Sequence, residues 1–151
     1  MGRKKSVKVQ RIRQIENHLR NYNTYKVGIK NLQRQLDYIM PNITANYELV
    51  NSSGVFTIKS DTEKYAIDRI ESRRALNIHE DIQRYQIIID SIDEAMKELS
   101  DLERKFIENR YFLRKTIGQT AIELGYSEKY IFNLRNQLFD KLLISLSSLI
   151  I

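Results

Sequence analysis

Apolar and aromatic side chains recur in alternating steps of four and three along one stretch of the chain. They stand at Ile78, Ile82, Tyr85, Ile89, Ile92, Met96 and Leu99. This heptad spacing draws a single apolar stripe along a helix, and such a stripe needs a facing helix to cover it. The facing helix is either the first helix of the same chain, folded back as a hairpin, or the same helix of a second chain. This stretch is therefore predicted to be a helix that packs against another helix.

Helix breakers are scarce, with one proline and five glycines in 151 residues. Long helices are therefore expected, and the predicted fold class is all-α. We predict a first helix over residues 6–40. Pro41 should end it, because proline has no N–H to continue the hydrogen-bond ladder and disfavours helical geometry in the residue before it. Gly28 weakens the middle of this helix by about 1 kcal/mol relative to alanine.

Residues 42–60 are rich in Asn, Ser and Thr and are predicted to form a connector. Within it, residues 55–58 can form a short extended piece. A loop of this length is unusual in a compact domain, which indicates a functional or partly disordered segment. Ser60 or Asp61 then caps a second long helix, which runs to about residue 100.

A third part of the chain begins with another capping box, because Glu103 stands three residues after Ser100. Three helices are predicted here: one to about Phe112, one over residues 116–124 and one over residues 128–146. An apolar stripe closes the chain and must be buried, either against its own module or across a dimer interface. Its members are Leu142, Leu143, Leu146, Leu149 and Ile150.

The stretch from residue 117 to residue 134 has the pattern of a helix-turn-helix. Ala121 is small where two helices must cross closely, and Gly125 follows where the turn needs a positive φ. Ser127 can cap the next helix. The apolar residues predicted to lock the two helices together are Ile122, Leu124, Ile131 and Leu134. A helix held in this way can present its outer face to the major groove of DNA.

Positive charge is concentrated at the start of the chain. Residues 1–30 carry nine Lys and Arg side chains against Glu16 alone, whereas residues 31–99 have a net charge of −4 and residues 100–151 of +2. This asymmetry favours a polyanionic partner for the N-terminal segment. The alternatives are a solvated basic helix face and a segment that folds back on the acidic middle helix.

Several functional classes are disfavoured by composition. The absence of cysteine excludes disulfides and thiolate metal sites and fits a reducing cytoplasm. His18 and His79 are far apart in sequence, and no glycine-rich phosphate loop or nucleophile elbow occurs. No apolar run reaches the roughly 20 residues of a membrane span, and the basic start lacks the apolar core of a secretory signal. We therefore expect no enzymatic activity, cofactor, metal or membrane partner.

Residues 99–146 resemble region 4 of the bacterial sigma-70 family. The matching positions are Leu99, Leu102, Glu103, Arg104, Arg110, Tyr111, Phe112, Thr116, Ala121, Leu124, Gly125, Ser127, Ile131, Leu134, Arg135, Lys141 and Leu142. The region with which complete sigma factors open promoter DNA has no counterpart here. The resemblance implies a sigma-like module without a complete sigma factor.

The whole layout resembles the ArpU/RinA-type regulators of phage late genes, over about residues 15–146. The carrying segments are Leu19-Arg20-Asn21-Tyr22 with Tyr25-Lys26, Ile29 and Leu32, then residues 60–67 and 87–112. Those regulators join a basic N-terminal helix and a long middle helix to a sigma-like helix-turn-helix. The resemblance implies a transcriptional activator of packaging, structural or lysis genes, acting in the cytoplasm of a bacterial host cell.

If the unit docks as helix-turn-helix proteins do, the N-terminal half of the last helix enters the groove. Its outward positions are Ser127, Glu128, Lys129, Phe132, Asn133 and Asn136. Asn133 is the best base reader, because an amide can pair with N6 and N7 of adenine, and Asn136 is the second candidate. Lys129 suits guanine or a phosphate, Glu128 suits cytosine N4 or the helix dipole, and Phe132 suits a thymine methyl group or the core. Phosphate contacts are expected from Arg114, Lys115, Thr116, Gln119 and Arg135.

The predicted architecture is a long N-terminal helical hairpin in residues 1–99 and a three-helix sigma region 4-like module in residues 100–151. A homodimer is expected, because the heptad and the apolar tail offer more apolar surface than one hairpin needs. The predicted partner is double-stranded DNA. One alternative is a DNA-packaging adaptor of the small-terminase type, although those usually place the DNA-binding unit first. Another is a factor that binds host RNA polymerase through the sigma-like face without binding DNA itself.

Overall fold

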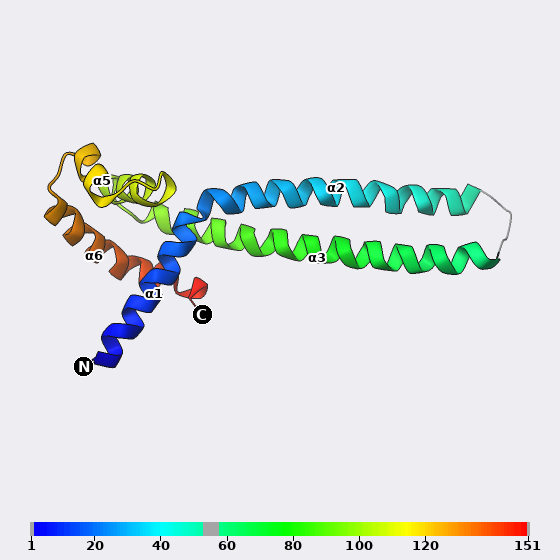
Figure 1. Cartoon of the computed structure of the whole chain (residues 1–151), viewed down its shortest axis with the longest axis horizontal. Helices are drawn as coiled ribbons and strands as arrows, with labels where there is room; N and C mark the ends of the chain where they lie inside the picture. The colour runs from blue at the N-terminus through cyan, green and yellow to red at the C-terminus, as the bar shows by residue number, and fades with distance from the viewer. Residues whose placement is uncertain (1, 53–57, 151) are drawn as a thin grey trace. The chain divides into compact units, whose positions relative to one another are not determined.

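The computed structural model describes residues 2–52 and 58–150, where every regular element is a helix and no strand occurs (Figure 1). The elements are α1 (Gly2–Arg20), α2 (Tyr22–Ser52), α3 (Ile58–Lys97), α4 (Asp101–Ile107) with a π-helical turn (Glu108–Phe112), α5 (Ile117–Leu124), α6 (Glu128–Ser145) and a closing 3-10 turn (Ser147–Leu149). The predicted all-α class is confirmed.

The chain divides into two units, which are described separately. The terminal unit joins the residues up to Tyr25 to those from Ile87 onward, and the middle unit is Lys26–Gln86. This division differs from the boundary expected between residues 99 and 100. The reason is that α1 and the end of α3 belong to the same unit as the C-terminal helices, and α1 contacts both α6 and the π-helical turn.

In the middle unit, α2 and α3 run antiparallel and share a narrow apolar seam (Figure 1). Its members are the buried Ile39, Ala75 and Ile78 and the half-buried Leu32, Leu36 and Ile82. They recur three or four positions apart on each helix, which places them on one face. The heptad positions Ile78 and Ile82 therefore face α2 of the same chain.

The prediction that Pro41 ends a helix is wrong, because α2 continues through it to Ser52. Proline removes one backbone hydrogen bond and disfavours helical geometry just before it, but it does not forbid a helix. A firm stop normally adds a glycine in left-handed geometry shortly afterwards. The next glycine after Pro41 is Gly54, thirteen positions later.

Most of the predicted connector is helical as well. The structure places residues 42–52 in α2, and α3 already begins at Ile58, ahead of the expected caps Ser60 and Asp61. Asn and Ser residues lower helix propensity by only a few tenths of a kcal/mol each, so their enrichment does not by itself unfold a helix. The extended piece expected at residues 55–58 lies outside the described residues, except for Ile58, which is helical.

The single helix predicted at the N-terminus is two helices. α1 already begins at Gly2, and Asn21 interrupts the run before α2 begins at Tyr22. Asn is a poor residue for a helix interior. The Asn21 N–H nevertheless still donates to the Asn17 carbonyl (3.1 Å), and the Tyr25 N–H donates to the Asn21 carbonyl (2.8 Å). Tyr22 anchors the start of α2 in the terminal unit: its hydroxyl donates to Asp93 Oδ1 (2.5 Å), and its ring stacks on Phe112 with centroids 4.4 Å apart.

The terminal unit has a core to which α1, α3, α4, the π-helical turn and α6 all contribute. Its fully buried apolar members are Ile15, Leu19, Ile92, Phe106, Ile107, Tyr111, Ile131, Leu138, Phe139, Leu142 and Leu146. Tyr111 meets Phe106 and Phe139 edge to face, with centroids 6.0 and 6.1 Å apart. The heptad and the apolar tail, on which the expectation of a dimer rests, are thus partly covered by the chain itself.

Candidate nucleic-acid interface

The segment from α5 to α6 is shaped by caps at three points. Thr116 accepts a hydrogen bond from the Gln119 N–H (3.1 Å), and the Gln119 side chain accepts one from the Thr116 N–H (3.0 Å). Gly125 ends α5 with φ 76°, a geometry that glycine adopts without the steric cost of a Cβ. Ser127 caps α6 by accepting from the Tyr130 N–H (3.2 Å). The predicted backbone roles of Gly125 and Ser127 are confirmed.

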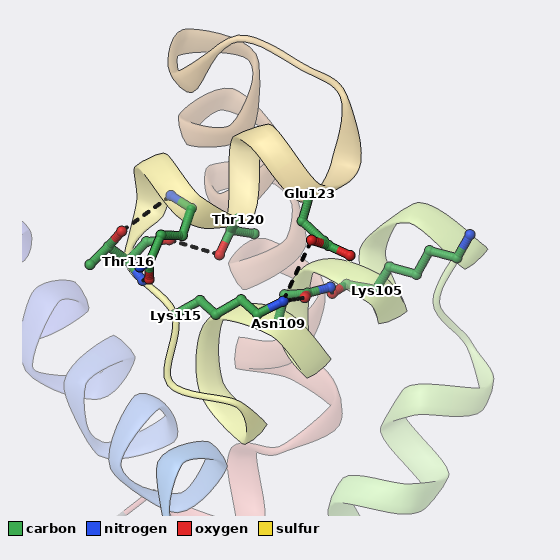
Figure 2. Close-up of polar contacts among 7 residues, drawn as sticks. Lys105, Asn109, Lys115, Thr116, Thr120 and Glu123 are labelled. Atoms are coloured by element: carbon green, nitrogen blue, oxygen red, sulfur yellow. Dashed lines mark hydrogen bonds and ion pairs between the residues drawn. The ribbon is translucent and has the colours of Figure 1, made fainter.

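The linker before α5 is tied down by polar contacts (Figure 2). Lys115 Nζ donates to Asn109 Oδ1 (2.8 Å) and lies 3.7 Å from Glu123 Oε2. The Thr120 hydroxyl donates to the Thr116 carbonyl (2.8 Å). Lys115 and Thr116 therefore have partners within the fold, as Gln119 does in its capping box. Contact of these three groups with DNA stays a prediction.

Arg114 lies in the left-handed region with φ 56°, which is uncommon for a residue with a side chain. Its guanidinium donates to the Arg20 carbonyl (3.1 Å), and Arg110 donates to the Lys115 carbonyl (2.9 Å). These two bonds link the linker to α1 and to the π-helical turn. Arg114 therefore helps to position α5, and its contact with phosphate stays a prediction.

α6 has two distinct faces. The inner face consists of Ile131, Leu138, Phe139 and Leu142, all buried. Six side chains at the start of the helix are exposed: Ser127, Glu128, Lys129, Phe132, Asn133 and Asn136. Lys129, Asn133 and Asn136 follow one another at steps of four and three, which aligns them in one strip. This strip, called the α6 strip below, is the candidate interface.

Arg135 is held by a partner that the sequence analysis missed. Its Nη2 lies 2.8 Å from Glu16 Oε1, and the Tyr111 hydroxyl donates to the same oxygen (2.9 Å). The guanidinium also lies 4.9 Å from the centre of the Phe139 ring, a cation–π arrangement. Only 24% of the Arg135 side chain is exposed. Arg135 thus joins α6 to α1, and its predicted contact with phosphate remains untested.

The charges in this cluster support one another. Burial alone would raise the pKa of Glu16, but the hydrogen bonds from Arg135 and Tyr111 and the charge of Arg135 hold that pKa below its ordinary value. Burial and the neighbouring Glu16 carboxylate raise the pKa of Tyr111 well above its ordinary value. Glu16 is therefore ionised and Tyr111 is a neutral donor at neutral pH. The available sequence signal was that Glu16, the one acidic residue of the basic segment, shares the apolar face of Ile15 and Leu19.

The prediction that Ile122 packs between α5 and α6 is wrong. Ile122 is 84% exposed, so it does not lock α5 against α6. Ala121 and Thr120 are buried in α5 instead, because the helix turns the neighbouring position outward. Near Ile122, the rings of Tyr126 and Tyr130 stack with centroids 4.5 Å apart. The turn between α5 and α6 therefore carries large apolar side chains in contact with solvent.

Metal binding needs a cluster of ligating side chains, and a membrane span needs a long apolar helix. Within the described ranges, no three His, Asp or Glu side chains are grouped as a metal site would need. None of the described helices combines the length and apolar character of a membrane span. Comparison of the chain with protein-family models, curated proteins and solved structures finds no match.

Proposed function

We propose that this protein is a sequence-specific, double-stranded-DNA-binding regulator of transcription. In this proposal, α5 and α6 act as a helix-turn-helix of the sigma-70 region 4 type, and α2 and α3 form a helical hairpin. The observation that carries the proposal is the α6 strip: Lys129, Asn133 and Asn136 reach solvent from the first half of a helix whose other face is buried. A helix presented in this way suits the major groove.

Each group on the strip has a chemistry that fits a base edge. The side-chain amide of Asn133 can donate to N7 of adenine through its NH2 group and accept from N6 through its oxygen. Lys129 suits guanine or a phosphate, and Phe132, which is 49% exposed, is free to meet a thymine methyl group. Backbone contacts would come from Lys115, Thr116 and Gln119, which lie at the start of α5.

The biological setting is proposed from the resemblance to ArpU/RinA-type regulators. On that basis the protein activates late genes of a phage or prophage, and a homodimer reads two half-sites. The buried face of α1 already packs in the core of the terminal unit. A dimer would therefore have to use surface outside that core. Exposed apolar residues of the middle unit, such as Ile70 and Leu76, offer such surface.

A second candidate function is binding to host RNA polymerase without direct contact to DNA. The stacked and exposed pair of Tyr126 and Tyr130 favours it, because tyrosine is enriched among the residues that carry the binding energy of protein interfaces. The exposed Ile122 adds apolar surface on α5. The two functions differ in a simple prediction, since only the first requires the purified protein to select DNA.

The test is selection of binding sites from a random-sequence duplex library by the purified full chain at about 150 mM salt, where phosphate contacts alone bind weakly. We expect enrichment of a short motif. Retention of DNA without enrichment would contradict sequence-specific reading and favour a packaging adaptor. No retention, together with capture of RNA polymerase, would favour the second candidate.

A further inference from the structure

The N-terminal helix presents a cationic face that the proposed function does not yet use. Lys4, Lys8 and Arg11 stand at steps of four and three on α1, so they point to one side of the helix. All three are exposed, and together with Val7 and Leu143 of α6 they line a hollow on the surface.

α1 is fixed to α6 along its length. Ile15 and Leu19 are buried in the core, and Glu16 holds Arg135 of α6 at 2.8 Å. Nearer the N-terminus, Lys8 Nζ lies 2.8 Å from Asp140 Oδ1 of α6. The basic segment is therefore part of the terminal unit, and Lys8 has a defined position relative to the α6 strip.

That position follows from the spacing along α6. Asp140 comes one helical turn after Asn136, which is about 6 Å along the axis at 1.5 Å per residue. The major groove is about 12 Å wide. When the first half of α6 occupies the groove, its second half passes toward the sugar-phosphate backbone at the groove edge. Lys8, bonded to Asp140, is carried to the same edge.

We infer that α1 is a phosphate-binding element, in which Lys4, Lys8 and Arg11 contact the DNA backbone beside the groove that α6 enters. The inference rests on the proposed function. Its ligand class is the duplex phosphate backbone, to which an exposed cationic helix face is complementary in charge. These contacts fix the orientation of the protein on DNA and carry no sequence information.

The test is the salt dependence of binding to a fluorescent 30-base-pair duplex of mixed sequence, measured by anisotropy from 50 to 300 mM salt. The variant replaces Lys4, Lys8 and Arg11 by Gln. Its matched control replaces Arg69, Arg73 and Arg74, which are exposed on α3, by Gln. Thermal melting by circular dichroism checks that both variants fold.

Each lost phosphate contact lowers the slope of log K against log salt by about 0.9. We therefore expect the α1 variant to lower the slope by about 1.8 to 2.7, where the lower value holds if Lys8 stays paired with Asp140 on DNA. The single variant Arg11→Gln should lower it by about 0.9, with the control close to the unmodified chain. An unchanged slope in both α1 variants, while the unmodified chain binds, would overturn this inference alone. Failure of the unmodified chain to bind the duplex at 50 mM salt would overturn the proposed function as well.

Discussion

Each of the two units is stabilised by a different kind of internal contact. In the middle unit, α2 and α3 meet along a single apolar seam of short aliphatic side chains. The terminal unit has a larger core, in which three aromatic rings pack among aliphatic side chains. It also has capping boxes and the hydrogen-bonded cluster of Glu16, Tyr111 and Arg135. The seam rests on apolar contacts, which are not directional, whereas the cluster joins particular atoms through hydrogen bonds. The α6 strip, which we propose as the DNA-reading surface, belongs to the terminal unit.

The largest expected effect comes from the aromatic core. Phe106→Ala empties a fully buried site in the terminal unit and should lower the free energy of unfolding by about 3–5 kcal/mol. Ile78→Ala in the seam should cost less, about 2 kcal/mol, because the smaller side chain leaves a smaller cavity. Urea unfolding followed by circular dichroism measures both. Equal losses would contradict the larger cavity cost expected for the fully buried Phe106 in the core of the terminal unit.

The polar cluster gives the next largest effect. Glu16→Gln leaves Arg135 without its counter-charge in a mostly buried place, and it should lower the free energy of unfolding by about 2 kcal/mol. Asp101→Asn breaks an exposed pair with Arg104 and serves as the control, with an expected loss below about 0.5 kcal/mol. If the two variants unfold at the same urea concentration, Glu16 does not organise the terminal unit.

Acid should weaken the terminal unit in two steps. Burial lowers the pKa of His18 below 6.5, despite a hydrogen bond to the Leu149 backbone, so the stability tied to its neutral form starts to be lost as the pH falls below 6.5. Glu16 and Glu103 have pKa values below their ordinary 4.5, because bonds from Arg135 and Lys141 respectively outweigh burial. Their contribution is complete above pH 4.5 and is lost as the pH falls through the lowered values.

The measurement is the urea midpoint between pH 7 and pH 3 for the unmodified chain, Glu16→Gln and His18→Gln. The first variant should flatten the curve below pH 4.5, and the second should flatten the decline that begins below pH 6.5. A decline of the same shape in all three proteins would show that other groups control the acid response.

The smallest expected changes in the free energy of unfolding come from replacing one glycine in each unit by alanine. A Cβ on Gly28 in α2 would meet Tyr85 at 3.7 Å, an ordinary contact, so Gly28→Ala should raise the free energy of unfolding by about 0.5–1 kcal/mol. A Cβ on Gly118 in α5 would lie 3.0 Å from Glu128 Oε1 and must displace that side chain. Gly118→Ala should therefore raise the free energy of unfolding by less than Gly28→Ala does. A larger gain at Gly118, seen in the melting temperature, would contradict this packing.

The local features were predictable from sequence because their causes are local. Gly125, Ser127 and the capping box at Ser100 act within a few residues, and each takes its predicted backbone role. The prediction at Pro41 is wrong because it counts only the backbone hydrogen bond that proline removes. It leaves out the hydrogen bonds of the helical residues on both sides of Pro41. The pairing of Glu16 with Arg135 spans 119 positions, and no periodicity within either helix encodes it.

The same limit applies to the candidate interface. Helical periodicity indicated which side chains of α6 point outward, and Lys129, Asn133 and Asn136 are indeed exposed. Periodicity did not show that Arg135 is held by α1, or that Ile122 faces solvent, since both depend on how the helices pack. Periodicity therefore predicted the exposed side chains of the α6 strip better than the contacts around it.

The most direct test of the central claim is the effect of Asn133→Ala on binding to the selected motif and to a mixed-sequence duplex, measured by anisotropy at one salt concentration. The control is Asn31→Ala, an exposed amide on α2. We predict that Asn133→Ala weakens binding to the motif by about 1–3 kcal/mol and leaves binding to mixed DNA nearly unchanged. The control should leave both unchanged. Equal weakening on the two duplexes, or none on either, would show that Asn133 does not read the sequence.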